Sequence, residues 1–317
     1  MIAACLLCPL QNSLLFGQKS LNCGVYFFRR TFIMTLFQFF IGVLIMLSMI
    51  IRPFLYKPAA RYFPAEMSVA FTSTWLMVGL ILSLPLFGNQ LTIDALASPY
   101  LLLTIIKGLL LFWLIKLQQI VNKESTSSSV FFGFIALALG SLANNLFFHE
   151  GLKAFQLACI CGFGLLGILY MFKGDARRLS VKGLVSFWLI VLFVALFSVT
   201  DHLAIPKIGW YAHLFVSSVV MFLACLCHGI SRQDFKNIFR NKELAGAGCF
   251  YVVSEFLIIY SSTNLLPVSF VAVFMRIASP AVMVISAIKY KEQSWQNQLA
   301  FGLIALCLAL PLILIKG

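Results

Sequence analysis

The sequence is poor in charged residues, which make up only 10% of its 317 positions, against roughly 25% in soluble domains. Acidic residues are especially scarce, with ten Asp and Glu in a chain that is 62% hydrophobic. Exposing that much apolar surface to water would cost more free energy than folding could recover. The composition therefore excludes the soluble globular class and predicts an integral membrane protein.

Segments of about ten residues with alternating hydrophobicity, the pattern of a transmembrane barrel, are also missing. The apolar runs are instead long, continuous and rich in Leu, Ile and Phe. Such runs predict helices, because a helix satisfies its own backbone polar groups in lipid. We expect an all-α membrane protein with ten spans, near residues 32–52, 65–87, 98–119, 126–147, 152–172, 183–201, 208–229, 244–263, 267–288 and 295–316.

Motifs of common enzymes are absent: the sequence has no HExxH, no GxSxG and no Walker loop. We therefore expect neither catalysis by these mechanisms nor ATP-driven pumping by this chain, and no cofactor. The nine cysteines lie mostly inside apolar runs, and only Cys227 has a second metal ligand type beside it, His228. These cysteines are interpreted as small apolar residues at helix interfaces, so no metal site is expected.

The net charge of +13 does not indicate nucleic acid binding, because Lys and Arg fall mainly in the breaks between apolar runs. Fifteen of them lie at or after the ends of odd-numbered spans and three after even-numbered spans. Since cytoplasmic loops are enriched in Lys and Arg, this asymmetry predicts cytoplasmic odd loops and both termini outside. The expected location is the cytoplasmic (inner) membrane.

The last two spans repeat an earlier part of the chain. Ser125 to Lys173 and Leu265 to Gly317 each contain two apolar runs around a short acidic turn, and Glu150 aligns with Glu292. Ten spans therefore divide into two sets of five, residues 34–173 and 174–317. Because five is odd, the halves are inserted in opposite directions, and such inverted repeats bind solute where the halves meet.

Residues 1–33 do not fit the repeat. The opening MIAACLLCPLQ is apolar but short, and it has no positively charged region before it. A signal-like leader, an interfacial helix and a translation start at Met34 all remain open, and the last is preferred.

Each half resembles the EamA-type repeat of the drug/metabolite transporter (DMT) superfamily. The resemblance rests on the small-residue turns NKESTSSSVFFGF and STNLLPVSFVAVF, the acidic turns at Glu150 and Glu292, and the Ser279-Pro280 pair in the ninth span. It covers residues 34–317. The resemblance implies ten helices, transport of a small organic solute and a central site between the repeats.

Charged side chains at bilayer depth are costly, at about 2.5–3.5 kcal/mol on insertion scales, and usually mark function. Three lie inside apolar spans: Lys107, Glu255 and Arg276. In one interpretation they bind a solute, with Lys107 and Arg276 holding its anionic end and Glu255 its cationic end. In the other, Glu255 and Arg276 form a closed ion pair and Lys107 extends to the membrane surface.

A weaker set of candidates surrounds this level. Trp113 aligns with Glu255 across the repeat, and His213 and Tyr251 are further predicted solute contacts, although aromatic packing also accounts for such residues. Pro280 is expected to kink the ninth span and to take part in gating. Asp201 and His202 are expected at a helix end, where a solvated pair is favoured over a proton relay.

The preferred interpretation is a secondary transporter that moves a small zwitterionic or anionic metabolite by alternating access. An amino acid or an amino-acid-bearing cofactor such as S-adenosylmethionine would suit these charges. A coupling proton or an exchanged metabolite is a possible second partner, and the lipid bilayer surrounds the chain. The alternative is a membrane enzyme acting on a lipid through Asp201, His202 and His213; a structural scaffold is the third possibility.

Overall fold

A computed structural model describes residues 36–62, 65–125, 128–148, 154–173, 179–228, 236, 238, 242–266, 268–290 and 295–314. All of them belong to one compact unit, Met34–Ile315. The regular structure within these residues is helical throughout. The predicted N-terminal segment and both acidic turns, at Glu150 and Glu292, lie outside the described residues.

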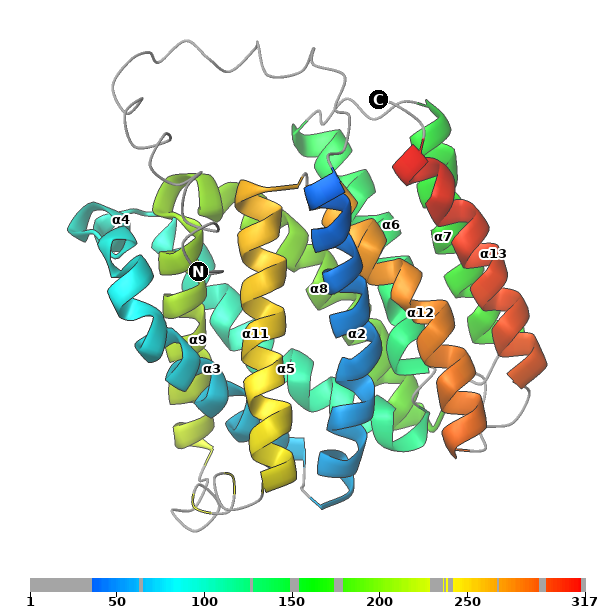
Figure 1. Ribbon diagram of the computed structural model, residues 1–317, viewed down its shortest axis with the longest axis horizontal. Coiled ribbons are helices and arrows are strands. Elements are labelled where there is room, and N and C mark those ends of the chain that lie inside the picture. Colours follow the sequence, from blue (N-terminus) through cyan, green and yellow to red (C-terminus); the bar gives the residue numbers. More distant parts are fainter. Residues whose placement is uncertain are drawn as a thin grey trace. The chain divides into compact units, whose positions relative to one another are not determined.

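Long helices dominate this unit (Figure 1). Two short elements, the 3-10 helix η2 (Gly88–Gln90) and α4 (Ile93–Ala97), connect α3 to α5. The long helices are α2 (Leu36–Tyr62), α3 (Ala65–Phe87), α5 (Leu101–Glu124), α6 (Ser128–Phe148), α7 (Ala154–Lys173), α8 (Val181–Ile208), α9 (Trp210–Cys227), α11 (Lys242–Asn264), α12 (Val268–Tyr290) and α13 (Trp295–Leu314).

Seven of the described helices are long and apolar enough to cross a membrane: α2, α3, α5, α7, α8, α9 and α11. Many of their large apolar side chains point away from the other helices, among them Leu82, which is 75% exposed, and Phe172, which is 70% exposed. Lipid is the environment in which such a surface is stable. The prediction of an all-helical, multi-pass membrane protein is confirmed at this level.

The helices pack in a connected set of pairs. α5 lies against α8 and α9, and α2 lies against α11 and α12. α3 contacts both α9 and α11, while α6 contacts α7 and α8. α13 packs on α12 and α7. In Figure 1, α11, α2 and α12 stand side by side at the front of the unit, with α13 beyond α12.

The sixth span is longer than predicted. The apolar pattern predicts an end at Asp201, but α8 continues for two further turns to Ile208 with Pro206 inside the helix. Proline is tolerated in membrane helices where neighbouring groups satisfy the freed backbone. Gly209 then takes a φ of 82°, which favours glycine, and α9 begins at the next residue. The expectation that Asp201 lies in a solvated pair at a helix end is therefore wrong.

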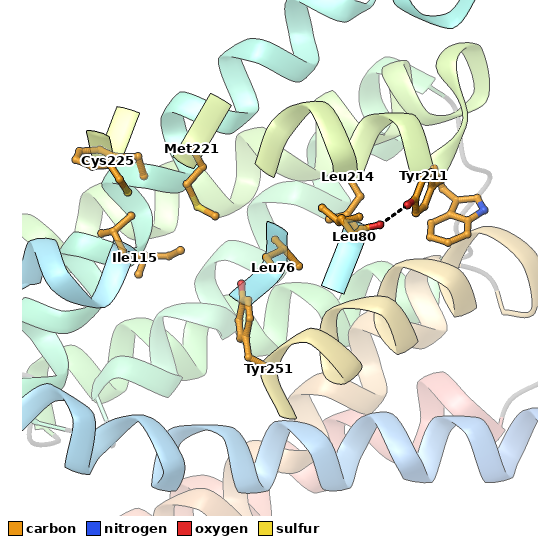
Figure 2. Close-up of a cluster of buried hydrophobic side chains, with 11 residues drawn as sticks. Leu76, Leu80, Ile115, Tyr211, Leu214, Met221, Cys225 and Tyr251 are labelled. Carbon is orange, nitrogen blue, oxygen red and sulfur yellow. Dashed lines mark hydrogen bonds between the residues drawn. The ribbon is translucent and has the colours of Figure 1, made fainter. Parts of the chain in front are cut away.

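A buried apolar cluster joins α3, α5, α9 and α11 (Figure 2). Leu76 and Leu80 of α3 contribute to it, and Tyr251 extends from α11 toward Leu76. The Tyr211 hydroxyl donates a hydrogen bond of 2.7 Å to the carbonyl oxygen of Leu80. This bond satisfies a polar group that would otherwise be costly to bury, so α9 is held against α3 beside the site described next.

Candidate functional site

Lys107 lies at the centre of a buried polar network that joins three helices. It projects from α5 and is only 7% exposed. Its Nζ atom is 2.5 Å from Oδ1 of Asp201 on α8 and 3.2 Å from Nε2 of His213 on α9. A buried ammonium group persists only when it is paired and hydrogen-bonded, and this network supplies both conditions.

His213 is fully buried and is bonded through both ring nitrogens. Nε2 lies 2.8 Å from Oδ1 of Asp201, and Nδ1 lies 2.8 Å from the hydroxyl oxygen of Thr104, one turn before Lys107 on α5. The Thr104 hydroxyl can either donate or accept, so the ring can adopt either tautomer here. The position of the ring proton is thus not fixed by its partners.

Asp201 faces the interior of the helix assembly. The exposed apolar face of α8 contains Val185, Trp188 and Leu192. Leu192 precedes Asp201 by nine residues, which at about 100° per residue places the two on opposite sides of the helix. The Asp201 side chain nevertheless retains 33% of its accessible surface. The accessible part of its side chain therefore lies on the inward side, among the other helices.

A second polar pair joins α2 and α11. Nη1 of Arg52 lies 2.6 Å from Oε1 of Glu255, and both side chains are about one-fifth exposed. Glu255 follows the buried Ser254 and is about 180° around α11 from the exposed Gly246. Ser254 in turn donates to the Ser48 hydroxyl of α2 at 3.1 Å. This pair also faces inward.

Tyr251 belongs to the second pair. The guanidinium carbon of Arg52 is 4.2 Å from the centroid of its ring, a cation–π geometry. Tyr251 is also 5% exposed and one turn before Glu255. The structure therefore brings Tyr251 and Glu255, two of the predicted solute contacts, together around Arg52.

Trp113, also a predicted solute contact, lies apart from both ion pairs. It is 44% exposed and shares the outward face of α5 with Leu102, Ile106 and Leu109. Its ring packs edge-on against His228, with centroids 6.1 Å apart, and Lys116 lies over it at 5.2 Å. Trp113 is thus on a different face of α5 from Lys107.

Arg276 and Pro280 both lie within α12, which is helical through both positions. Their side chains lie outside the described residues. Lys107, Glu255 and Arg276 were predicted to bind one solute together. The structure instead places Lys107 and Glu255 in two separate ion pairs, with Asp201 and Arg52. Both partners were expected at helix ends. Glu255 is bonded to Arg52, a partner that neither interpretation of the sequence considered.

Both ion pairs connect the two predicted halves of the chain. Lys107 and Asp201 are 94 residues apart, and Arg52 and Glu255 are 203 residues apart. In each pair one partner precedes residue 174 and the other follows it. The pairing of Arg52 was not predicted, because Arg52 was counted as a loop charge at the end of the first span. α2 in fact continues for ten more residues to Tyr62. The apolar segment PFLY directly after Arg52 is the feature of the sequence that indicates a longer helix.

The part of the chain that the structure describes contains no group of three His, Cys, Asp or Glu side chains able to hold a metal ion. No model of a known protein family matches the sequence, and no curated protein is significantly similar to it. The function must therefore be argued from the two ion pairs and the helix arrangement.

Proposed function

We propose that the protein is a ten-helix secondary transporter of the cytoplasmic membrane, built as an inverted repeat of five plus five helices in the manner of the EamA-type transporters that it resembles. It moves a small zwitterionic or anionic metabolite by alternating access. The observation that carries the proposal is the presence of two inward-facing ion pairs, Lys107–Asp201 and Arg52–Glu255, each of which joins one half to the other.

The helix pairing supports the repeat. Matching α2, α3, α5, α6 and α7 in order with α8, α9, α11, α12 and α13 converts each main contact into another one. The pair α5–α8 becomes α11–α2, α6–α8 becomes α12–α2, and α5–α9 becomes α11–α3. The pairs α3–α9 and α7–α13 convert into themselves. A two-fold axis in the membrane plane would produce this exchange.

Contacts at the helix ends are also exchanged when the first five long helices are matched with the last five. Glu124 at the end of α5 accepts hydrogen bonds from the backbone nitrogen and hydroxyl of Ser180, which caps the start of α8. The equivalent contact joins the end of α11 to the start of α2, where the Gln38 amide donates to the carbonyl oxygen of Leu265 at 2.9 Å. The two contacts use different chemistry at equivalent places, which favours a repeat of backbone architecture rather than of sequence.

The chemistry of the pairs favours a charged solute. Each pair offers one cation and one carboxylate on an inward face, and each keeps part of its surface accessible. A solute that carries a carboxylate and an amine can separate such a pair, because its carboxylate can bind the cation of the pair and its amine can bind the carboxylate of the pair. Arg52 is suited to hold the carboxylate, because guanidinium binds carboxylate through two parallel hydrogen bonds. Arg276 supplies a further cation within α12, which favours solutes with at least one acidic group.

The alternative, a membrane enzyme acting on a lipid, draws on one observation: Asp201 and His213 are bonded at 2.8 Å, as in an acid–base pair. Lys107 shares the same carboxylate oxygen and ring nitrogen, which reduces the ability of the pair to activate a nucleophile. We therefore rank transport first. Mass spectrometry of lipids from cells with and without the protein would detect an altered lipid if the alternative holds.

Transport can be tested without knowing the solute. Proteoliposomes containing the protein would be loaded with a ¹³C-labelled metabolite extract, and the metabolites that leave would be identified by mass spectrometry. We expect selective release of a small acidic or zwitterionic metabolite, and its loss in Glu255→Gln and Arg276→Ala with normal membrane insertion. Release indistinguishable from that of empty liposomes would refute transport, and full release by either variant would refute the site.

A further inference from the structure

We propose that Lys107, Asp201 and His213 form a proton-binding site, and that its proton is carried together with the acidic group of the solute. The inference rests on the proposed transport function, which it deepens by naming the coupling ion and the residues that hold it. The position of His213 between a cation, a carboxylate and a hydroxyl carries the argument.

Every protonation state of the His213 ring has partners in this site. With a proton on Nδ1 alone, the ring donates to Thr104 and Nε2 accepts from Lys107. With a proton on Nε2 alone, it donates to Asp201 and Nδ1 accepts from Thr104. With both, it donates to Asp201 and Thr104. A ring with a purely structural role is normally held in one tautomer by fixed partners, whereas this one is free to gain and lose a proton without leaving a buried group unpaired.

Charge balance connects the proton to the solute. With the ammonium of Lys107, the carboxylate of Asp201 and a neutral His213, the cluster has no net charge. A proton taken from water, forming a new N–H bond at the ring, leaves a buried net charge of about +1, which is stable only beside an anion. The accessible parts of the Lys107 and Asp201 side chains lie on the inward side, so a solute carboxylate can reach the Lys107 ammonium there and replace its contact with Asp201, which stays bonded to the protonated His213 ring. Proton and acidic solute therefore bind together.

Within the described residues, the other ionisable groups of α5 and α8 lie away from His213. On α5, Lys116, Lys123 and Glu124 follow Lys107 by nine or more residues, and on α8, Lys182 lies in the first turn and His202 and Lys207 are exposed. α9 packs on α5, α8, α3, α11 and η2. α3 carries one ionisable residue, Glu66, at its far end, and η2 carries none. The acidic residue of α11 beyond its first turn, Glu255, is bonded to Arg52, and Tyr251 and Tyr260 are the tyrosines of this helix. Lys107 and Asp201 thus control the charge at His213.

Protonation can be measured independently of transport. The full chain, with its four histidines ¹⁵N-labelled, would be studied in lipid nanodiscs by solid-state NMR from about pH 9 to about pH 5, a range in which histidine titrates. The His213 signals are those lost in His213→Gln. We expect the ring to change from one proton to two. In Asp201→Asn the doubly protonated fraction should fall about tenfold at a given pH, because a charge-assisted acceptor is lost. In Lys107→Met it should rise.

Asp94→Asn is the matched control, since Asp94 is an exposed acid of α4 outside the cluster, and it should leave the signals unchanged. A ring that keeps one proton throughout, or one that responds equally to Asp94→Asn and Asp201→Asn, overturns the proton site.

Coupling is tested in the extract-loaded proteoliposomes with the lumen either more acidic or more alkaline than the medium. Faster release from the acidic lumen is expected. Equal release in both gradients overturns the coupling and leaves transport intact, whereas no release together with a titrating ring refutes transport and leaves the proton site.

Discussion

Arg52 of α2 and Glu255 of α11 form an ion pair with a nitrogen–oxygen distance of 2.6 Å, although 203 residues separate them in the sequence. The guanidinium of Arg52 also covers the ring of Tyr251, one turn earlier on α11. A movement of one half of the chain relative to the other must stretch or break this pair. In the proposed transport cycle, a solute that competes for either charge shifts the balance between the conformations.

Exchanging the two charges separates a structural role from solute binding. Arg52→Gln or Glu255→Gln alone should destabilise the protein by roughly 1.5–3 kcal/mol, the range for a hydrogen bond to a charged group. The double variant Arg52→Glu/Glu255→Arg should recover most of this loss, because a pair can form again, but should not recover metabolite release, because the charges have changed places. Thermal unfolding in detergent and release from proteoliposomes provide the two measurements. Recovery of both would show that the pair is only a structural lock.

The two aromatic residues predicted to contact solute should differ in effect. Tyr251→Leu removes the ring beneath Arg52, and a cation–π contact contributes about 0.5–2 kcal/mol, so the affinity for solute should fall several-fold. Trp113→Leu changes an outward-facing residue and should leave release near that of the unmodified protein. Concentration-dependent release rates would show the difference. A stronger effect at Trp113 than at Tyr251 would contradict the placement of the site between the halves.

The apolar pattern was sufficient to predict helices, because a lipid-exposed helix must be apolar over a length fixed by the bilayer. Their ends were less predictable. α8 continues past Asp201 and Pro206, and α2 continues past Arg52. A charge near the end of an apolar run is also typical of a loop, so the apolar pattern alone does not show that these helices continue. Lys107 and Glu255 lie inside long apolar helices, as predicted. Their partners were not predicted, because pairing depends on which helices pack together, and single-sequence periodicity carries no information about that.

The orientation predicted from loop charges remains open to direct measurement. In a variant whose cysteines are replaced by serine, we expect a cysteine at Asp94 in α4 to react with an impermeant maleimide added to intact cells. A cysteine at Lys236 should react only after the membrane is permeabilised. The reason is that Lys236 lies in the segment between α9 and α11, which is rich in Lys and Arg and is therefore expected on the cytoplasmic side. The reverse labelling pattern would show that the charge asymmetry does not determine orientation here.

Gly108 sets the distance between α5 and α9 and thereby positions its neighbour Lys107. A Cβ atom at this position would lie 2.6 Å from the backbone oxygen of Ser217 and 2.7 Å from Cβ of Val220, and a backbone cannot shift cheaply. Gly108→Ala should therefore separate the helices, weaken the contact between Lys107 and His213, and destabilise the protein by about 1–3 kcal/mol, as overpacking does. Gly246→Ala is the control: nothing lies within 4 Å of its added Cβ, and alanine favours a helix over glycine by about 1 kcal/mol. Thermal unfolding followed with a thiol-reactive dye would report both in a background that keeps only Cys159 and Cys225 of the nine cysteines, because these two are buried in the folded protein. Equal unfolding temperatures for the two variants would show that α5 and α9 are not in the close contact on which the proton site depends.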